Sequence, residues 1–369
     1  MSKSQLSQPK LRFKGFGGEW KFKIIEEILD YIQPANFIEK GEIKNKGLIP
    51  ILTPGKSFIL GYTDNENDVF SENSSILIDD FNLSMHFVDF KYKVRSSACK
   101  ILKLKDDNKN NLYLIYLIIK MVKFTLTEHK RYYISYFSKF GIWIPSLPEQ
   151  QKIAQFFSLL DHHIKLWERK LELCLLKKKY YLDKNINNKI NNKKFIRFSD
   201  LLQESTNKVN STNCLVCSVG KTGFQERKIN ISLNNKVQEL KSTTYGDLCI
   251  GMGTTQIDFK MNNIKDKMCG ISKAYKVFKT NFNYPLFLEL YVNRYLDYFS
   301  KNYMIVSARQ GKNVDLESFL NDGIYFNSLD SVEKIVNTYK KIKKCEICIK
   351  LNIEKLKDRK KYYLNNLFI

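Results

Sequence analysis

The sequence predicts an α+β protein with two globular heads separated by a long antiparallel two-helix coiled coil, built as a pseudo-two-fold tandem repeat. Two observations predict this fold class: apolar residues recur in heptads along two long segments, and the two segments resemble each other. Segment 141–186 returns without a gap as segment 323–368, 182 residues later (323 − 141). Both copies begin with Gly-Ile and contain Lys-Lys-Tyr-Tyr-Leu near their ends. A gap-free match with both ends in register indicates a tandem duplication.

The first long helix is expected to begin near Ser146. Glu149 follows at the spacing of a capping box, and Pro148 falls in the first turn, where a missing backbone N–H costs little. Beyond this start, two lines of residues at seven-residue spacing form one narrow seam of the kind that packs against another helix. The seam residues of this helix are Ile153, Phe157, Leu160, Ile164, Trp167, Leu171, Cys174 and Lys178.

The second copy has a matching seam, so the two helices are expected to pack against each other. Because the first helix enters the second head and the second helix leaves it, the second must run back to bury its seam. The pair is therefore antiparallel, and each helix of about 40 residues spans roughly 60 Å. The seam residues of the second helix are Ile335, Tyr339, Ile342, Glu346, Ile349, Ile353 and Leu356.

The charged seam residues predict the register of the pair. A charge in a seam needs a partner or a position near a helix end, and placing Lys178 opposite Glu346 gives both charges a partner. This register brings Leu171 opposite Ile353. It also places Lys360 near an end of the pair, where its ammonium reaches water. The alternative is that the charges of Lys178 and Glu346 both lean out into solvent.

The remaining segments are expected to form the heads. Residues 1–145 form the first head, 146–190 the first long helix, 191–327 the second head and 328–369 the second long helix. The polar run 184–194 is a linker or a loose continuation of the helix. Strands are expected near 49–56, 75–80, 98–104, 214–219, 247–252 and 274–278, and core helices near 112–124 and 284–299.

Composition restricts the class of partner. Sixty-one basic residues against 38 acidic ones give a net charge of +23, which favours a polyanionic partner. The alternative is that the lysine content reflects an AT-rich genome. The start of the sequence lacks the apolar core of a signal peptide, and the most apolar run, 112–119, is too short to span a bilayer. We therefore expect a soluble, cytoplasmic protein with no membrane contact.

The cysteines do not predict a metal site. Cys214 and Cys217, like Cys345 and Cys348, have the spacing of half a zinc site. The two pairs lie far apart in the sequence, and no histidine stands near them at ligand spacing. We expect all four to be buried and reduced, with no metal bound.

No catalytic motif is apparent either. Gly220-Lys221-Thr222 invites comparison with a phosphate-binding loop, but Leu215 stands where that motif requires a glycine. The sequence contains no cofactor fingerprint, no acidic and basic cluster typical of a nuclease, and no nucleophile paired with a histidine. The chain is expected to be non-catalytic and to bind no cofactor.

Several motifs resemble one protein family. Segment 144–153, IPSLPEQQKI, followed by a long Leu- and Lys-rich helix, resembles the central conserved region of the specificity subunit of type I restriction–modification systems. Segment 9–20 resembles the N-terminus of that family, and segments 245–248 and 270–275 resemble parts of its second half. The second copy of the central motif departs from the pattern, with Asn and Ser residues in place of its Pro and Glu.

The resemblance implies a sequence-specific DNA-recognition subunit. Each head would read one half of a bipartite target in double-stranded DNA, and the helices would set the spacer and dock methyltransferase (modification) subunits. Restriction subunits would join through the assembled complex, and S-adenosylmethionine and ATP would belong to these partners. One alternative is a structural coiled-coil protein whose heads bind other proteins. Another is an enzyme whose motif is not recognisable.

Base reading requires polar side chains on loops that reach into the DNA grooves, although most such residues contact phosphates. In the first head the candidates are Lys56, Tyr62, His86, Arg95, Ser96 and Ser97. In the second head they are Lys221, Thr222, Gln225, Arg227, Lys228, Thr254, Thr255, Gln256, Arg309, Gln310, Lys312 and Asn313.

Overall fold

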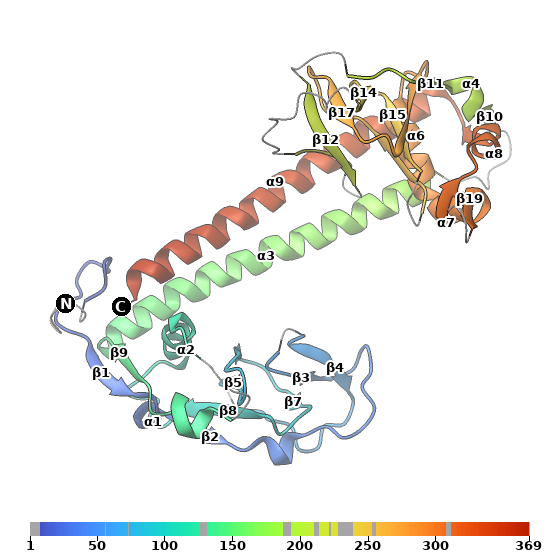
Figure 1. Cartoon of the computed structure of the whole chain (residues 1–369). Helices are drawn as coiled ribbons and strands as arrows, with labels where there is room; N and C mark the ends of the chain where they lie inside the picture. Colours follow the sequence, from blue (N-terminus) through green and yellow to red (C-terminus); the bar gives the residue numbers. More distant parts are fainter. Residues whose placement is uncertain are drawn as a thin grey trace. The chain divides into compact units, whose positions relative to one another are not determined.

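The computed structural model describes residues 8–55, 57–72, 74–125, 131–186, 193–209, 214–220, 223–227, 239–252, 256–307 and 311–368. The chain divides into two compact units, 1–168 with 351–369, and 169–350. Each unit contains one head and a part of each long helix, α3 (Leu147–Asn185) and α9 (Leu329–Leu367) (Figure 1). Both helices are 39 residues long.

The head of the first unit contains two sheets and a two-stranded ribbon. The larger sheet has the strand order β2-β8-β5-β6, the smaller has the order β4-β3-β7, and β1 pairs with β9 in the ribbon. Only the β3–β7 pair is parallel among these paired strands. The elements are β1 (Lys21–Ile24), α1 (Ile25–Ile28), β2 (Leu29–Ile32), the 3-10 turn Pro34–Phe37, β3 (Ile49–Leu52), β4 (Ile59–Thr63), β5 (Ser75–Asp79), β6 (Met85–Val88), β7 (Lys93–Val94), β8 (Cys99–Leu104), α2 (Leu112–Met121), the π-helical turn Tyr133–Phe137 and β9 (Gly141–Ile144).

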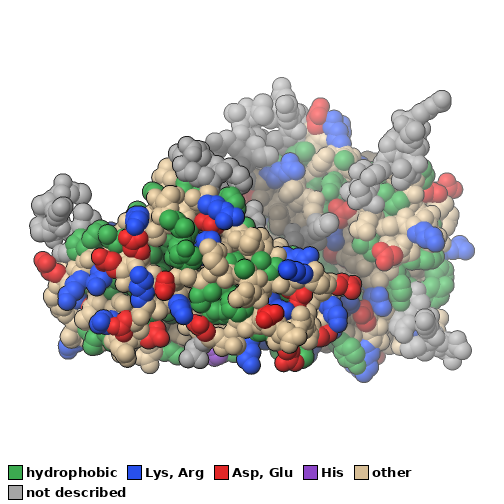
Figure 2. All heavy atoms as spheres, turned by 90° about the horizontal axis from the view of Figure 1, so that it is seen from below, with side chains coloured by type: hydrophobic (Ala, Val, Ile, Leu, Met, Phe, Trp, Pro, Cys, Tyr) green, Lys and Arg blue, Asp and Glu red, His purple; other side chains and the backbone are tan. Residues whose placement is uncertain are grey.

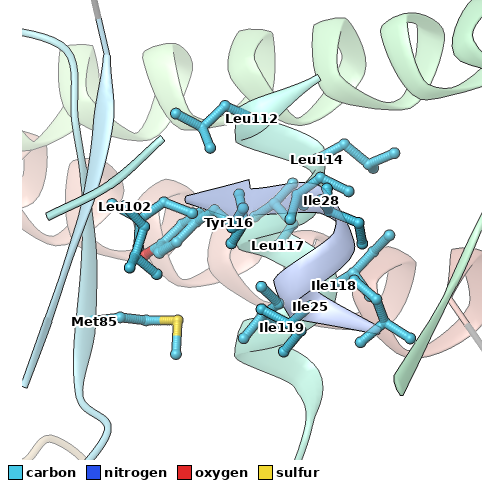
Figure 3. Close-up of a cluster of buried hydrophobic side chains, with 14 of the residues drawn as sticks. Ile25, Ile28, Met85, Leu102, Leu112, Leu114, Tyr116, Leu117, Ile118 and Ile119 are labelled. Carbon is cyan, nitrogen blue, oxygen red and sulfur yellow. The ribbon is translucent and has the colours of Figure 1, made fainter. Parts of the chain in front are cut away.

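Helix α2 is the centre of the core of this head. The side chain of Asn111 accepts a hydrogen bond from the backbone N–H of Leu114 at 3.0 Å and so caps the start of the helix. Seven of its ten residues are buried, so the helix is apolar on nearly all sides. It packs with α1 and the larger sheet, and Figure 3 shows ten labelled members of this cluster. The predicted helix 112–124 is confirmed, although it ends at Met121.

The head of the second unit contains a ribbon of β10 and β21, a sheet of order β11-β18-β15-β16 and a sheet of order β13-β12-β17-β14. Its elements are β10 (Lys194–Arg197), α4 (Phe198–Leu201), β11 (Leu202–Ser205), β12 (Leu215–Gly220), β13 (Gly223–Glu226), β14 (Lys241–Thr243), β15 (Leu248–Gly251), β16 (Asp258–Met261), β17 (Cys269–Ile271), β18 (Tyr275–Thr280), α6 (Pro285–Arg294), α7 (Leu296–Tyr303), β19 (Met304–Ser307), β20 (Gly311–Val314), α8 (Leu316–Asn321) and β21 (Gly323–Phe326). The single helix expected over 284–299 is instead two helices, because the chain turns at Tyr295 and brings Phe299 into the core.

The two heads have matching topologies. The four strands of the larger first-unit sheet, β2-β8-β5-β6, correspond in order and direction to β11-β18-β15-β16 in the second unit. In the smaller sheets, β12 pairs with β17 in parallel as β3 pairs with β7, and the second unit adds β14. In each ribbon the first strand, β1 or β10, is followed directly by a short helix, α1 or α4. The second strand, β9 or β21, leads into a long helix, α3 or α9. The predicted strands in both heads are confirmed within two residues, except that the strand expected over 49–56 ends at Leu52, before the Pro54-Gly55 turn.

The start of α3 is fixed by a buried ion pair with the N-terminal segment. Both carboxylate oxygens of Glu149 accept hydrogen bonds from the guanidinium of Arg12, each at 2.7 Å. The same guanidinium donates to the carbonyl oxygens of Gly17 and Gly18. Glu149 is 1% exposed, so the capping box predicted from its spacing is wrong: the carboxylate is engaged by a segment 137 residues away in sequence. A bidentate Arg–carboxylate pair is the geometry that best offsets the cost of burying both charges.

The start of α9 is capped in a different way. The backbone N–H of Ser328 donates to the hydroxyl of Ser331, and the N–H of Ser331 donates to the hydroxyl of Ser328, each at 3.2 Å. This reciprocal arrangement satisfies two N–H groups that the first turn of a helix leaves without partners. The capping box therefore occurs in the second copy, with serine in the place of glutamate.

Within each unit, segments of α3 and α9 pack antiparallel. In the first unit Lys360 pairs with Asp161, at 2.5 and 2.7 Å, and Lys357 pairs with Glu168 at 2.7 Å. In the second unit Lys178 Nζ lies 2.6 Å from Glu346 Oε2, as the predicted register requires. Lys360, whose ammonium was expected to reach water, is partly exposed and also has a partner that was not predicted, the carboxylate of Asp161, which directly follows the seam residue Leu160.

The seam positions are buried or half-buried, and most of their neighbours on the same helices are exposed, although Ala154 and Val336 are buried as well. On α3, Ile153, Phe157, Leu160 and Ile164 are buried, and Trp167, Leu171, Cys174 and Lys178 are half-buried. On α9, Ile335, Ile342, Glu346, Ile349 and Ile353 are buried, and Tyr339 and Leu356 are half-buried. Cys214 and Cys217 are buried as expected. The expected burial of Cys345 and Cys348 is wrong: both are exposed, because they lie beside the seam and not in it.

Glu346 is the most strongly perturbed carboxylate of the seam. Its burial alone would raise its pKa, but hydrogen bonds and charges from Lys178, Lys350 and Lys343 outweigh burial and lower the pKa to about 2. Because the folded-state pKa lies below the usual value of 4.5, this carboxylate stabilises the folded unit above about pH 4.5. That contribution is lost as the pH falls toward 2.

We predict that Glu346→Lys destabilises the second unit by about 3–5 kcal/mol, because it places a fourth cation in a buried site among three lysines. Adding Lys178→Glu should restore part of the loss, with a coupling energy of about 0.5–3 kcal/mol. Urea denaturation of the four proteins of this double-mutant cycle measures the coupling. As a control, Lys178→Glu combined with Lys355→Glu, an exposed position on α9, should give additive changes. Additive changes for residues 178 and 346 as well would show that the ion pair does not stabilise the helix pair.

Candidate nucleic-acid interface

The structure describes about half of the candidate DNA-contacting residues. Lys56, Lys221, Thr222, Lys228, Thr254, Thr255, Arg309 and Gln310 lie outside the described residues, as does the side chain of Lys312. The remaining candidates divide into residues whose side chains support a turn and residues that lie on or beside strands. His86 and Arg95 of the first unit belong to the first group.

His86 and its neighbours hold the turn that follows β3. The imidazole of His86 stacks on the ring of Phe58 with the centroids 4.3 Å apart and the planes 19° from parallel. Burial lowers the pKa of His86, and hydrogen bonds to the backbone of Gly55 and Pro54 act in the opposite direction. The hydroxyl of Ser84 also donates to the carbonyl oxygen of Pro54 at 2.8 Å. His86 is therefore a support for Pro54, Gly55 and Phe58, which flank the candidate Lys56 in the sequence, and is itself half-buried.

Arg95 performs a similar supporting role directly after β7. Its Nη1 donates to the carbonyl oxygens of Glu39, at 2.8 Å, and Gly41, at 3.1 Å. The carboxylate of Glu39 in turn accepts from the N–H of Gly41 and pairs with the buried ammonium of Lys93 at 3.0 Å. These contacts order the loop 39–41 on the surface of the smaller sheet. Part of the hydrogen-bonding capacity of Arg95 is thus used within the head.

The same serine turn precedes the corresponding strand in both units. In the first unit the hydroxyl of Ser96 accepts from the N–H of Ala98 at 3.0 Å, just before β8. In the second unit the hydroxyl of Ser272 accepts from the N–H of Ala274 at 3.3 Å, just before β18. Ser96 and Ser97 are among the candidate DNA contacts predicted from the sequence, but Ser272 and Lys273 are not. The Ser-x-Ala pattern before matching strands was the signal that could have identified Ser272 and Lys273 as the equivalent positions.

In the second unit this turn borders a hollow of about 470 Å³. Arg227, Lys273 and Tyr275 lie on its walls, and Lys273 forms an exposed ion pair with Glu239 at 2.8 Å. Tyr275 donates from its hydroxyl to the carbonyl oxygen of Val219 at 2.9 Å. Burial, followed by the charge of Asp258, raises the pKa of Tyr275 to about 12, so this phenol stays protonated at neutral pH. The arrangement offers two cations, a hydroxyl and an aromatic ring at one surface.

The other described candidates are on or beside strands. Tyr62 is a half-buried residue of β4, and its backbone pairs with that of Lys44. Gln225 lies on β13, directly before Glu226 and Arg227, and is exposed. Gln256 is exposed ahead of β16, and Asn313 is exposed on β20, where its side chain accepts from the N–H of Val314. These residues belong to different strands or strand ends.

Three further features bear on the kind of site. Among the described residues, no group of three or more His, Cys, Asp or Glu side chains could hold a metal ion. Within the same ranges no helix is both long and apolar enough to cross a membrane. On the face drawn in Figure 2, basic and acidic side chains are interspersed, so the net positive charge does not gather into one patch on that face.

We predict that Arg95→Ala loosens loop 39–41, because it removes two hydrogen bonds from a charged donor that together contribute about 1.5–3 kcal/mol. The backbone amide of Gly41 should then exchange with deuterium at least roughly tenfold faster, since 1.4 kcal/mol corresponds to a factor of ten. Lys44→Ala, which removes an exposed ion pair with Asp64, is the control and should change exchange little. Unchanged protection in the Arg95 variant would contradict the supporting role.

Comparisons with known proteins agree with this architecture. Residues 17–173 match the family model described as the type I restriction modification DNA specificity domain. The chain is 34% identical over 187 residues to the specificity subunit of the type I restriction enzyme EcoR124I/EcoR124II from Escherichia coli. That match covers 48% of this chain and 46% of the subunit, so it spans just under half of the relative's length. The fold is similar to the crystal structure of a type I restriction–modification S subunit from M. genitalium, with a TM-score of 0.67 at 16% identity, over 98% of this chain and 99% of the other. The segment 17–173 therefore belongs to the family of type I restriction modification DNA specificity domains.

Proposed function

We propose that the chain is the sequence-specific DNA-recognition subunit of a type I restriction–modification complex. Each head reads one half of a bipartite target, and the paired helices set the distance between the halves. Residues 1–145 and 191–327 are the two recognition domains, and 146–190 and 328–369 are the helical segments. Catalysis and its cofactors, S-adenosylmethionine and ATP, belong to the modification and restriction subunits, and the complex works on DNA in the cytoplasm.

The observation that supports this proposal best is that one architecture occurs twice with different surface residues. The sheet order and ribbon are the same in both heads, and the first head lies in the segment that matches the DNA specificity family. The turns differ around the shared serine: Arg95 and Ser97 in the first head correspond to Ile271 and Lys273 in the second. A shared scaffold with different polar side chains suits a protein that reads two different half-sites, because base edges are distinguished by side-chain donors and acceptors.

An exposed apolar stripe on α3 supports docking of modification subunits. Leu159, Leu166, Leu173 and Tyr180 recur every seven residues, and each is more than half exposed, between 51% and 67%. Leu176, at 56%, extends the stripe. This heptad lies outside the seam that packs against α9, and a second heptad on one helix is suited to a further helix. We propose that a helix of the modification subunit covers it.

We predict that exchanging one head changes one half of the target. Residues 198–322, which lie between the two strands of ribbon β10-β21, would be replaced by the equivalent segment of a relative with a known target. The second half-site should change, and the first half-site and spacer length should stay the same, because the helices and the first unit are untouched. Sequencing of methylated bases in a host that carries the complex measures the target.

The matched control exchanges residues 25–140, which lie between the strands of ribbon β1-β9. This exchange should alter the first half-site alone. A change of both half-sites in either hybrid would contradict independent recognition by two heads. Normal assembly without any methylation in the unaltered complex would favour the alternative, a structural coiled-coil protein whose heads bind other proteins.

We also predict that Leu159→Glu combined with Leu166→Glu abolishes co-purification of the modification subunit, because two carboxylates would be buried without partners. Since both side chains are exposed, the free subunit should keep its thermal unfolding temperature within about 2–4 °C. Leu48→Glu, an equally exposed leucine in the first head at 68%, is the control and should leave the complex intact. Retained co-purification by the double variant would show that the partner docks elsewhere.

A further inference from the structure

Two thiols face each other across the helix pair of the second unit. Cys174 is a seam residue of α3, and its Sγ lies 3.9 Å from the carbonyl oxygen of Ile342 on α9. Cys345 lies three residues beyond Ile342, almost one turn along α9, and its thiol is within hydrogen-bonding distance of the Cys174 thiol. Cys174 is half-buried, and Cys345 is exposed. From the sequence, Cys174 was expected in the seam and Cys345 in a Cys-x-x-Cys pair, and nothing connected the two, which are 171 residues apart (345 − 174).

The surrounding contacts fix this juxtaposition. Lys178, one turn after Cys174, pairs with Glu346, the residue directly after Cys345, at 2.6 Å. The hydroxyl of Tyr181 reaches the carbonyl oxygen of Lys334 at 3.4 Å further along the same pair. Because these contacts lie on both helices next to the thiols, the register cannot slip without breaking a buried ion pair.

We propose that Cys174 and Cys345 form a reversible disulfide across the helix pair when the protein meets a low-molecular-weight disulfide such as oxidised glutathione. The two thiols are neighbours on facing helices, as disulfide formation requires. The site is specific to the second unit. The residues at the matching positions of the repeat, 182 residues away, are Leu356 and His163 in the first unit, so no thiol pair exists there.

The reaction balances as two thiol–disulfide exchanges. The thiolate of the exposed Cys345 attacks one sulfur of the small disulfide, forming a mixed disulfide and releasing one small thiolate. The thiolate of Cys174 then attacks the sulfur of Cys345, and the second small thiolate leaves. Two protein thiols are oxidised, the small disulfide is reduced to two thiols, and the two protons from the cysteines end on those thiols.

The surroundings of Cys174 make the second exchange the slower one at neutral pH. Burial raises the pKa of Cys174, the neighbouring Cys345 and Glu346 raise it further, and Lys178 acts in the opposite direction. The thiolate that must attack is therefore scarce below the usual pKa of 9.0. Formation of the disulfide should accelerate as the pH rises, and a mixed disulfide on Cys345 should precede it.

The test uses the full-length protein, treated with oxidised glutathione, blocked with N-ethylmaleimide and digested with trypsin. Mass spectrometry should find LELCLLK, residues 171–177, joined to CEICIK, residues 345–350. Because the second peptide also contains Cys348, three variants assign the bond. The linked pair should be lost in Cys174→Ser and Cys345→Ser and retained in Cys348→Ser, all three with unchanged circular dichroism.

Four outcomes would overturn the proposal. One is a link that persists in Cys345→Ser through Cys348, and another is a bond between Cys345 and Cys348 within the single peptide. The third is a mixed disulfide on Cys345 that never resolves, even at alkaline pH, which would show that the thiols do not approach in solution. A disulfide between two copies of the chain would appear as a dimer on a non-reducing gel and would also contradict it.

Discussion

Burial of the heptad seam is the constraint on which the rest of the structure depends. Neither long helix can bury its apolar line alone, so each compact unit takes segments of both. The first unit therefore includes the last residues of the chain: Leu367 and Phe368 are part of its core, and Phe368 packs against Trp20 and Phe157. The backbone N–H of Leu11 donates to the carbonyl oxygen of Asn366 at 2.8 Å. The beginning, the middle and the end of the sequence thus meet in one fold.

Charges in the seam are balanced differently in the two units. Lys178 and Lys360 occupy equivalent positions of the repeat, and each needs a carboxylate within reach. In the second unit the carboxylate is Glu346, a seam residue. In the first unit it is Asp161, which directly follows the seam residue Leu160 and also accepts a hydrogen bond from the hydroxyl of Tyr113 at 2.5 Å. The two long helices therefore share this cation but pair it with a carboxylate at two different places.

The heads separate scaffold from surface. Residues that resemble DNA contacts in the sequence, such as His86 and Arg95, hold loops through hydrogen bonds to backbone carbonyls and amides. In the function we propose, such residues would influence recognition through the positions of neighbouring side chains. Direct contacts with DNA would fall to exposed side chains at the same strand ends, such as Lys273 and Arg227 around the hollow of the second unit. A change of specificity would then leave the sheets untouched.

The sequence by itself determined the two long helices and their seam, because helical periodicity is a local rule. It predicted the pairing of Lys178 with Glu346 from the balance of buried charges, beside the alternative that both charges lean into solvent. It also located strands at six places and the core helix α2 of the first head. Only the tertiary structure decided which polar side chains form hydrogen bonds or ion pairs with distant segments. Glu149 stands at capping-box spacing, yet its carboxylate pairs with Arg12, 137 residues away in the sequence. Cys345 lies beside a seam and faces Cys174 across the pair. The spacing of residues along one helix carries no information about a partner that a distant segment supplies. These contacts could therefore be identified only from the tertiary structure.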